Sequence, residues 1–146
     1  MVTVTTVSSN SNDTYTGATQ INYDSPVLTA IETLGDVDFY KYTATGNGIE
    51  QVNLTVPAGK NYDVIIYDSG LKPLSAGIKD ASESEEVIYK VISGATYYIK
   101  VFGVNSNYGN EFYTLKLSRA PLRYQTSYEY DANGNLKRKV TTILQS

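Results

Sequence analysis

The chain has 146 residues, a net charge of −3, and neither cysteine nor histidine. This length is enough for one domain with its own hydrophobic core, so a disulfide framework is not needed. The missing residue types exclude a Ser-His-Asp triad, a Cys-His pair and a zinc site built from thiolates or imidazoles. Carboxylate chemistry and metals that prefer oxygen ligands, above all calcium, remain open.

The composition favours strands over helices. Fourteen tyrosines accompany three phenylalanines and no tryptophan, and aromatic and β-branched residues suit a pleated, half-buried surface. The modest net charge gives no electrostatic basis for binding nucleic acid, and no apolar run is long enough for a transmembrane helix. We therefore expect no nucleic-acid partner and no membrane insertion.

The N-terminal segment 1–9 alternates valine and threonine before a polar stretch, which is typical of a strand or an extended linker. It lacks the basic region and the continuous apolar region of a signal peptide. If the parent protein is exported, we expect its signal to lie outside this sequence.

Short β-type runs then follow one another, separated by Gly, Pro, Asn and Asp. Such regular spacing of short strands predicts an all-β, antiparallel sandwich. Alternation predicts that Tyr97, Ile99 and Val101 face the core. The strand pattern is weakest over 71–84, and residues 79–86 are expected to form a polar loop. The predicted strands are 27–33, 37–44, 49–56, 62–68, 85–91, 96–103 and 111–118.

A change of composition near Pro121 predicts a boundary. Residues 1–118 carry 7 basic and 13 acidic side chains, whereas residues 119–146 carry 5 and 2. Proline cannot donate a ladder hydrogen bond. Beyond it, the β-type runs 124–130 and 135–143 are joined by a segment containing Asn-Gly, which is a strong hairpin signal. We expect a C-terminal β-hairpin at 119–146, too small to be stable alone.

Four sequence blocks occur in a familiar order and spacing: Asn12-Asp13-Thr14 with Ala18-Thr19, Gly35-Asp36-Val37-Asp38-Phe39-Tyr40-Lys41-Tyr42, Gly94-Ala95-Thr96-Tyr97-Tyr98-Ile99-Lys100-Val101, and Tyr113-Thr114-Leu115. With them, residues 10–118 resemble the bacterial pre-peptidase C-terminal domain. That family includes modules of secreted proteases and the collagen-binding domains of clostridial collagenases. The resemblance implies a jelly-roll-like β-sandwich.

A second resemblance covers only about 124–140. The string Tyr128-Glu129-Tyr130-Asp131-Ala132-Asn133-Gly134-Asn135-Leu136 is similar to one unit of the tyrosine-aspartate (YD) repeat of RHS proteins. Those repeats form β-sheet shells, and a single unit cannot bury its own face. The resemblance implies that the parent chain has an RHS-type region.

Carboxylate and amide oxygens near the start of the chain form a candidate calcium site. Calcium takes six to eight oxygen ligands. The matching segments of the collagen-binding relatives supply calcium ligands, and the relatives place glutamates where this chain has Ser8 and Asn10, so we expect weaker binding here. The open alternative is purely structural: an Asx-turn, a loop cap and acceptors for backbone N–H groups. The residues carried over are Asn12, Asp13, Asp36 and Asp38.

An exposed aromatic face is the candidate ligand-binding surface, built from Tyr98, Phe102 and Phe112 with Tyr67 or Tyr108 beside them. Aromatic rings with polar neighbours hold sugar rings or an extended peptide in β-sandwich modules. Cross-strand aromatic pairs also stabilise a sheet by themselves, which is the alternative. Collagen-binding relatives use tyrosines on the strand matching 97–104, and Phe102 and Val104 stand at two of those positions.

The clustered carboxylates Glu83, Glu85 and Glu86 lie in the polar loop, where we expect them to be solvated rather than a glycosidase pair. We therefore predict a non-catalytic accessory module of a secreted or cell-surface bacterial protein. It binds an extracellular polysaccharide or matrix protein, or it spaces neighbouring domains of the same chain. The alternative is a structural cap or entry domain of an RHS protein, with no ligand of its own.

Overall fold

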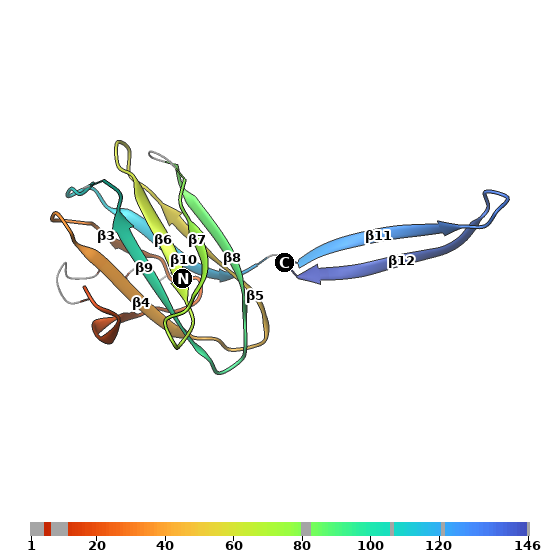
Figure 1. The fold of residues 1–146 in the computed structure, drawn as a ribbon, viewed down its shortest axis with the longest axis horizontal. Helices are drawn as coiled ribbons and strands as arrows, with labels where there is room; N and C mark the ends of the chain where they lie inside the picture. The colour runs from red at the N-terminus through yellow and green to blue at the C-terminus, as the bar shows by residue number, and fades with distance from the viewer. Residues whose placement is uncertain (1–4, 7–11, 80–82, 106, 121, 146) are drawn as a thin grey trace.

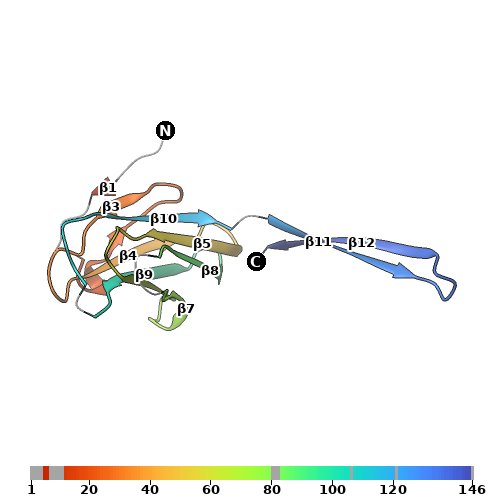
Figure 2. The ribbon, with the colours of Figure 1, turned by 90° about the horizontal axis from the view of Figure 1, so that it is seen from above.

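The structure, a computed structural model, describes residues 5–6, 12–79, 83–105, 107–120 and 122–145. Within these ranges the strands form two five-stranded sheets and a separate two-stranded ribbon. The sheets face each other as a sandwich, and the ribbon extends away from one end of it (Figures 1 and 2). The predicted all-β sandwich with a C-terminal hairpin is confirmed. No helix in the described ranges is long and apolar enough to cross a membrane.

The first sheet has the strand order β1-β3-β10-β5-β8. The short strand β1 runs parallel to β3, and the other neighbours are antiparallel. Residues 1–4 and 7–9 of the predicted N-terminal strand or linker (1–9) lie outside the described residues. The members of this sheet are β1 (Thr5–Thr6), β3 (Val27–Thr29), β10 (Tyr113–Arg119), β5 (Gly48–Thr55) and β8 (Glu85–Val91).

The second sheet has the order β2-β4-β9-β6-β7. Here too a two-residue strand, β2, adds in parallel at one edge, and the remaining pairs are antiparallel. A 3-10 turn, η1 (Tyr15–Gly17), precedes it. The members are β2 (Thr19–Gln20), β4 (Val37–Thr43), β9 (Thr96–Gly103), β6 (Tyr62–Tyr67) and β7 (Pro73–Gly77).

The core lies between the two sheets and follows the predicted alternation. Tyr97, Ile99 and Val101 of β9 are buried, as are Leu115 and its neighbours of the same parity in β10. A one-residue shift in register would turn each set to solvent, so burial of these apolar side chains fixes the pairing.

Strand β7 was not predicted. Its sequence, Pro-Leu-Ser-Ala-Gly, shows no alternation, and the strand forms because β6 offers it a partner at the sheet edge, with Val64 opposite Gly77. The predicted loop 79–86 also ends earlier than expected, because β8 begins at Glu85. Residues 80–82 of that loop lie outside the described residues.

Tyrosine supplies much of the core, and its hydroxyl groups bond to one another across the two sheets. The hydroxyls of Tyr40 and Tyr113 are 2.5 Å apart, and so are those of Tyr42 and Tyr89. A buried hydroxyl without a partner is costly, so these pairs fix how the sheets face each other. The buried tyrosines are Tyr40, Tyr42, Tyr62, Tyr89, Tyr97 and Tyr113.

The ribbon consists of β11 (Leu122–Tyr130) and β12 (Leu136–Gln145), which pair antiparallel. The Asp131 carboxylate closes the turn between them by accepting the backbone N–H groups of Asn133 and Asn135, both at 2.9 Å. Gly134 has a φ of 84°, a conformation that favours glycine. The hairpin predicted from the Asn-Gly pair is therefore present.

We expect Leu115→Ala to lower the free energy of unfolding by about 2–5 kcal/mol, because it opens a cavity in the core. Leu115 is 1% exposed, whereas Leu34, in the loop before β4, is 66% exposed. Leu34→Ala is the matched control, with a change expected within about 0.5 kcal/mol. Urea unfolding followed by circular dichroism measures both values. Equal losses for the two variants would contradict the assigned core.

Candidate functional site

The acidic end of the sandwich begins with Asn12, whose side chain is fully buried. Its backbone pairs with β4, since the Phe39 N–H donates to the Asn12 carbonyl at 2.8 Å. Its Nδ2 donates to the Phe39 carbonyl at 3.3 Å. These bonds attach the N-terminal segment to β4, one residue beyond Asp38.

Asp13 and Asp36 lie close together at this end, near enough for the Asp13 carboxylate to raise the pKa of Asp36. Asp36 lies in the loop that enters β4, and its Oδ2 accepts the backbone N–H of Glu32 at 3.1 Å. Burial raises the pKa of Asp36, and the negative charges of Asp13 and Glu32 raise it further. Sequence reasoning missed Glu32, which joins the group only because the β3–β4 loop folds back on itself.

Asp38 is the deepest acidic residue of this end, at 1% exposed. It accepts a hydrogen bond from the Tyr113 hydroxyl, which in turn bonds to the Tyr40 hydroxyl. Burial raises the pKa of Asp38 to about 7 from its ordinary 3.8, although the Tyr113 bond acts in the opposite direction. The nearby charges, with Asp36 first among them, raise it further.

Three buried oxygen atoms at this end have no hydrogen-bond partner among the residues that the structure describes: Asn12 Oδ1, Asp36 Oδ1 and the Tyr62 hydroxyl. Burial raises the pKa of Tyr62 to about 12, with smaller contributions from the charges of Glu111, Asp36 and Asp38. Native proteins rarely leave buried polar atoms unpaired unless a water or an ion satisfies them. Among the described residues, however, no three acidic side chains are arranged to hold a metal as they stand.

The four predicted metal ligands are thus brought together at one end of the sandwich, and we call them, with Glu32, the acidic cluster. The structural roles weighed for them are also realised in part, because Asp36 bonds to the loop backbone and Asn12 to β4. The acidic cluster consists of Asn12, Asp13, Glu32, Asp36 and Asp38.

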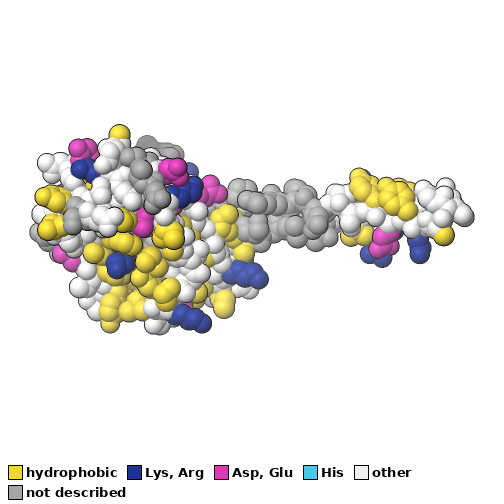
Figure 3. Space-filling view, turned by 45° about the horizontal axis from the view of Figure 1, so that its top comes forward, with side chains coloured by type: hydrophobic (Ala, Val, Ile, Leu, Met, Phe, Trp, Pro, Cys, Tyr) yellow, Lys and Arg dark blue, Asp and Glu magenta, His cyan; other side chains and the backbone are white. Residues whose placement is uncertain are grey.

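The outward side of the second sheet carries three cross-strand rows of side chains over β4, β9 and β6. Their centre on β9 reads Tyr98, Lys100, Phe102, with the Lys100 ammonium 5.0 Å from the centre of the Phe102 ring. Figure 3 shows hydrophobic side chains gathered on this face of the sandwich with lysine or arginine among them. We call this surface the outer aromatic face; its rows are Lys41–Tyr98–Tyr67, Phe39–Lys100–Ile65 and Val37–Phe102–Asp63.

The structure separates the three predicted ligand-binding residues. Tyr98 and Phe102 lie on the outer aromatic face, and Tyr15 of η1 packs edge-on against Tyr98, with ring centres 6.1 Å apart. Phe112, 56% exposed, instead precedes β10 of the other sheet. Its assignment to the same face was wrong, because strand alternation shows which side a residue faces but not which sheet its strand joins.

A cavity of about 210 Å³ joins the outer aromatic face to the acidic cluster. Asp36 and Val37 line it from the loop and the start of β4, and Lys100 and Phe102 line it from β9. A ligand lying along β9 would therefore meet rings, an ammonium group and a carboxylate in succession.

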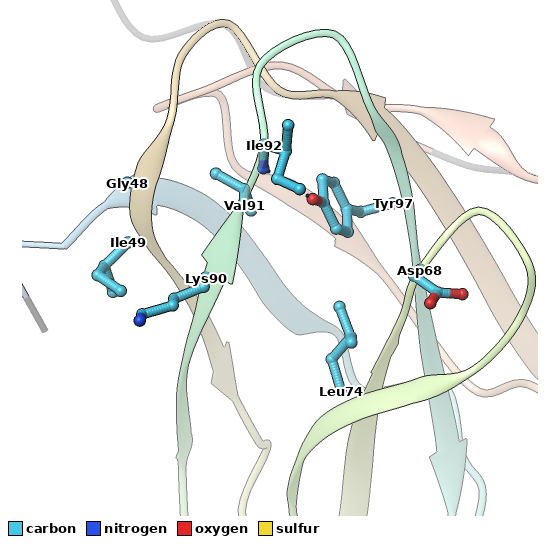
Figure 4. A pocket seen from close by; sticks show the side chains of 8 residues that line it. All are labelled: Gly48, Ile49, Asp68, Leu74, Lys90, Val91, Ile92 and Tyr97. Atoms are coloured by element: carbon cyan, nitrogen blue, oxygen red, sulfur yellow. Dashed lines mark hydrogen bonds between the residues drawn. The ribbon is translucent and has the colours of Figure 1, made fainter.

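A larger cavity of about 500 Å³ opens between the edge strands of the two sheets. Figure 4 shows Leu74 of β7 on one side, Val91 of β8 on another, and Tyr97 of β9 beside Ile92. The Tyr97 hydroxyl accepts the Ile92 backbone N–H at 2.9 Å. Sequence reasoning missed this cavity, since it depends on where β7 and β8 end.

Glu85 differs from the prediction, because it is buried at the start of β8 while Glu83 and Glu86 are exposed. Its Oε1 accepts the Lys79 backbone N–H at 2.6 Å, and burial raises its pKa. The carboxylate thus anchors the chain between β7 and β8. Adding a Cβ at Gly77 would collide with it at 2.8 Å, so the close approach of these strands depends on that glycine.

Comparison with solved structures shows what the sandwich is similar to. The pre-peptidase C-terminal domain of collagenase from Bacillus anthracis is 14% identical, with a TM-score of 0.59 over 69% of this chain and 94% of that one. A periplasmic inhibitor of g-type lysozyme, PliG of Aeromonas hydrophila, is 12% identical, with a TM-score of 0.47 over 81% of this chain and 98% of that one. At such identities the first likeness establishes a shared fold.

Neither the known protein families nor the curated proteins contain a match to this sequence. The resemblance of 124–140 to a tyrosine-aspartate repeat therefore stays a prediction. The resemblance of 10–118 to the pre-peptidase C-terminal domain is supported at the level of the fold.

The raised pKa of Asp38 predicts how stability depends on pH. The folded state holds the Asp38 proton more tightly than the unfolded chain, so this stabilisation is complete below about pH 4 and is lost as the pH rises through about 7. The shift corresponds to a loss on the order of 4 kcal/mol. Asp38→Asn keeps an acceptor for Tyr113 but cannot ionise, so we expect a much smaller loss.

Chemical unfolding in the presence of a chelator, at several pH values across this range, measures the effect. Asp24→Asn, at an exposed turn position, is the control and should keep the wild-type profile. A wild-type protein whose stability rises steadily across the range would contradict the prediction.

Proposed function

We propose that this chain is a non-catalytic accessory module of an exported bacterial protein, and that its outer aromatic face binds an extended extracellular polymer, a polysaccharide or a matrix protein. The observation that carries the proposal is that no other described sheet covers that face, whose rings Tyr98 and Phe102 are half-buried. The ribbon, which could have covered it, pairs only with itself among the described strands and extends away from the sandwich (Figure 1).

The arrangement of the face supports an extended ligand. Tyr98 and Phe102 stand two positions either side of Lys100 along one strand, so rings and an ammonium group alternate in a line. Stacking rings supply contact area, and polar groups beside them fix orientation. The fold shared with the pre-peptidase C-terminal domain of a collagenase is compatible with an accessory role.

We expect Tyr98→Ala to weaken polymer binding by about tenfold or more, because it removes a central ring of the face. The matched control is Phe112→Ala, an exposed aromatic beside the other sheet, which should bind like the wild type. Calorimetric titration of soluble polysaccharides and triple-helical collagen peptides against the three proteins measures this.

Thermal unfolding confirms that each variant is folded before binding is compared. Equal affinities for wild type and Tyr98→Ala would remove the outer aromatic face from the proposal. Binding by none of the panel would favour the alternative, a structural or spacing domain, for which the protruding ribbon is the supporting observation.

We further propose that the acidic cluster binds calcium. Among the described residues, Asn12 Oδ1 and Asp36 Oδ1 are buried without hydrogen-bond partners, and the Asp13 carboxylate lies near enough to raise the pKa of Asp36. A calcium ion would supply the missing partner and offset the repulsion. Asn12, Asp13, Asp36 and Asp38 would hold it, with small shifts of the carboxylates toward a common point.

Calcium should raise the unfolding temperature at millimolar concentration, with a gain of about 1–3 kcal/mol if the affinity is that of other extracellular modules. Because protons compete for the same carboxylates, the gain should be larger at pH 8 than at pH 5. Asp36→Asn should lose most of it. Asp68→Asn, in the turn between β6 and β7, should keep it.

Differential scanning calorimetry with calcium, magnesium or a chelator makes the comparison. An unfolding temperature that is the same with millimolar calcium and with chelator would contradict the calcium proposal and leave the polymer-binding proposal standing.

A further inference from the structure

The ribbon of β11 and β12 is incomplete as a sheet. Among the described strands these two pair only with each other, and the ribbon stands clear of the sandwich in both views (Figures 1 and 2). A lone two-stranded hairpin is at best marginally stable in water. Each outer edge also presents unpaired backbone N–H and C=O groups, which another strand can bind.

The two faces of the ribbon differ in chemistry. Tyr128, Tyr130 and Leu136 are 51%, 61% and 58% exposed, while Glu129 and Arg138 stand opposite each other across the strands. Figure 3 shows a cluster of hydrophobic side chains on one side of the outer half of the ribbon, and charged side chains together with further hydrophobic ones on the other. An added strand must match both faces to be stable.

The edge formed by β12 opposes addition of a second copy. Lys137, Arg138 and Lys139 follow one another in it, and consecutive cationic residues are a common means of blocking an edge strand. Pairing β12 with itself would bring these cations opposite one another or against apolar positions near the end of the strand.

The edge formed by β11 is complementary to itself. With a two-fold axis at Thr126, antiparallel pairing sets Arg123 opposite Glu129 of a second copy and Tyr124 opposite Tyr128, and each pair occurs twice. Opposite charges and aromatic pairs that stand directly opposite each other across strands stabilise a sheet. Residues of even number meet residues of even number in this register, so each side of β11 continues into the same side of the partner strand.

We infer that β11 is a dimerisation strand, through which two copies of this chain join about Thr126 into one sheet of order β12-β11-β11-β12. The pairing uses the unprotected edge of each ribbon and leaves the cationic β12 strands at the outer edges. Assembly therefore closes at two copies. The antiparallel register puts the two sandwiches at opposite ends of the shared sheet.

Charge reversal tests the register. Arg123→Glu places two negative charges together at each end of the pairing, so this variant should be monomeric. The double variant Glu129→Arg with Arg138→Glu keeps opposite charges at these two paired positions within one ribbon. Between copies, however, it sets Arg123 opposite the new arginine at position 129, so it should also be monomeric. Mixed in equal amounts, the two proteins regain complementary charges and should form a 1:1 heterodimer.

Light scattering coupled to gel filtration measures the masses at submillimolar concentration. Lys137→Glu, the same charge change on β12, is the matched control and should dimerise like the wild type. A monomeric wild type, a dimeric Arg123→Glu variant, or a mixture that stays monomeric would each overturn the proposal.

A single cysteine tests the axis independently, because the chain has none of its own. Opposed residues of antiparallel strands lie at Cα distances that suit a disulfide. With oxidised glutathione as the oxidant, Thr126→Cys should give a covalent dimer at least about tenfold faster than Thr141→Cys, which occupies the position opposite Thr126 on β12. Equal rates for the two variants would exclude the proposed axis.

Discussion

The hydrogen bonds that β4 sends across the core hold the two sheets in place. Its inward residues Asp38, Tyr40 and Tyr42 all bond to side chains on strands of the other sheet, β10 and β8. An unpaired buried hydroxyl is costly, and these bonds pair the hydroxyls of Tyr40 with Tyr113 and of Tyr42 with Tyr89. The geometry of the sandwich is therefore fixed by directional bonds as well as by apolar contact.

A second buried carboxylate has a similar role at the other end of the sandwich. Glu50 of β5 is fully buried and accepts the Tyr23 hydroxyl at 2.6 Å. Arg119 lies 3.9 Å from the same carboxylate oxygen and over the Tyr23 ring. Each end thus has one carboxylate held by tyrosines, but only Glu50 has a cation beside it. The end with Asp38 has acidic neighbours instead, and their negative charges add to the rise in the pKa of Asp38.

The same strands that carry this network also present the outer aromatic face. Alternation turns Asp38, Tyr40 and Tyr42 inward, and it turns the residues between them outward, beside Tyr98 and Lys100 of β9. Asp36 lines the cavity next to Phe102 and also acts electrostatically on Asp38. A proton or a cation bound at the acidic cluster would therefore change the charge beside both the core and the outer aromatic face, because the start of β4 contributes to both.

The sequence by itself determined the alternating strands, the inward set Tyr97, Ile99 and Val101 of β9, the hairpin at Asn133-Gly134, and the choice of Asn12, Asp13, Asp36 and Asp38 as the oxygen-bearing side chains of one candidate site. These features depend on neighbours along the chain, where the two-residue period and turn chemistry act directly. Only the tertiary structure decided that β7 exists, that Glu85 is buried, that Glu32 joins the acidic cluster and that Phe112 lies apart from Tyr98. Each of these depends on which strands become neighbours in space, and that choice is made by packing and hydrogen bonding between segments far apart in the chain.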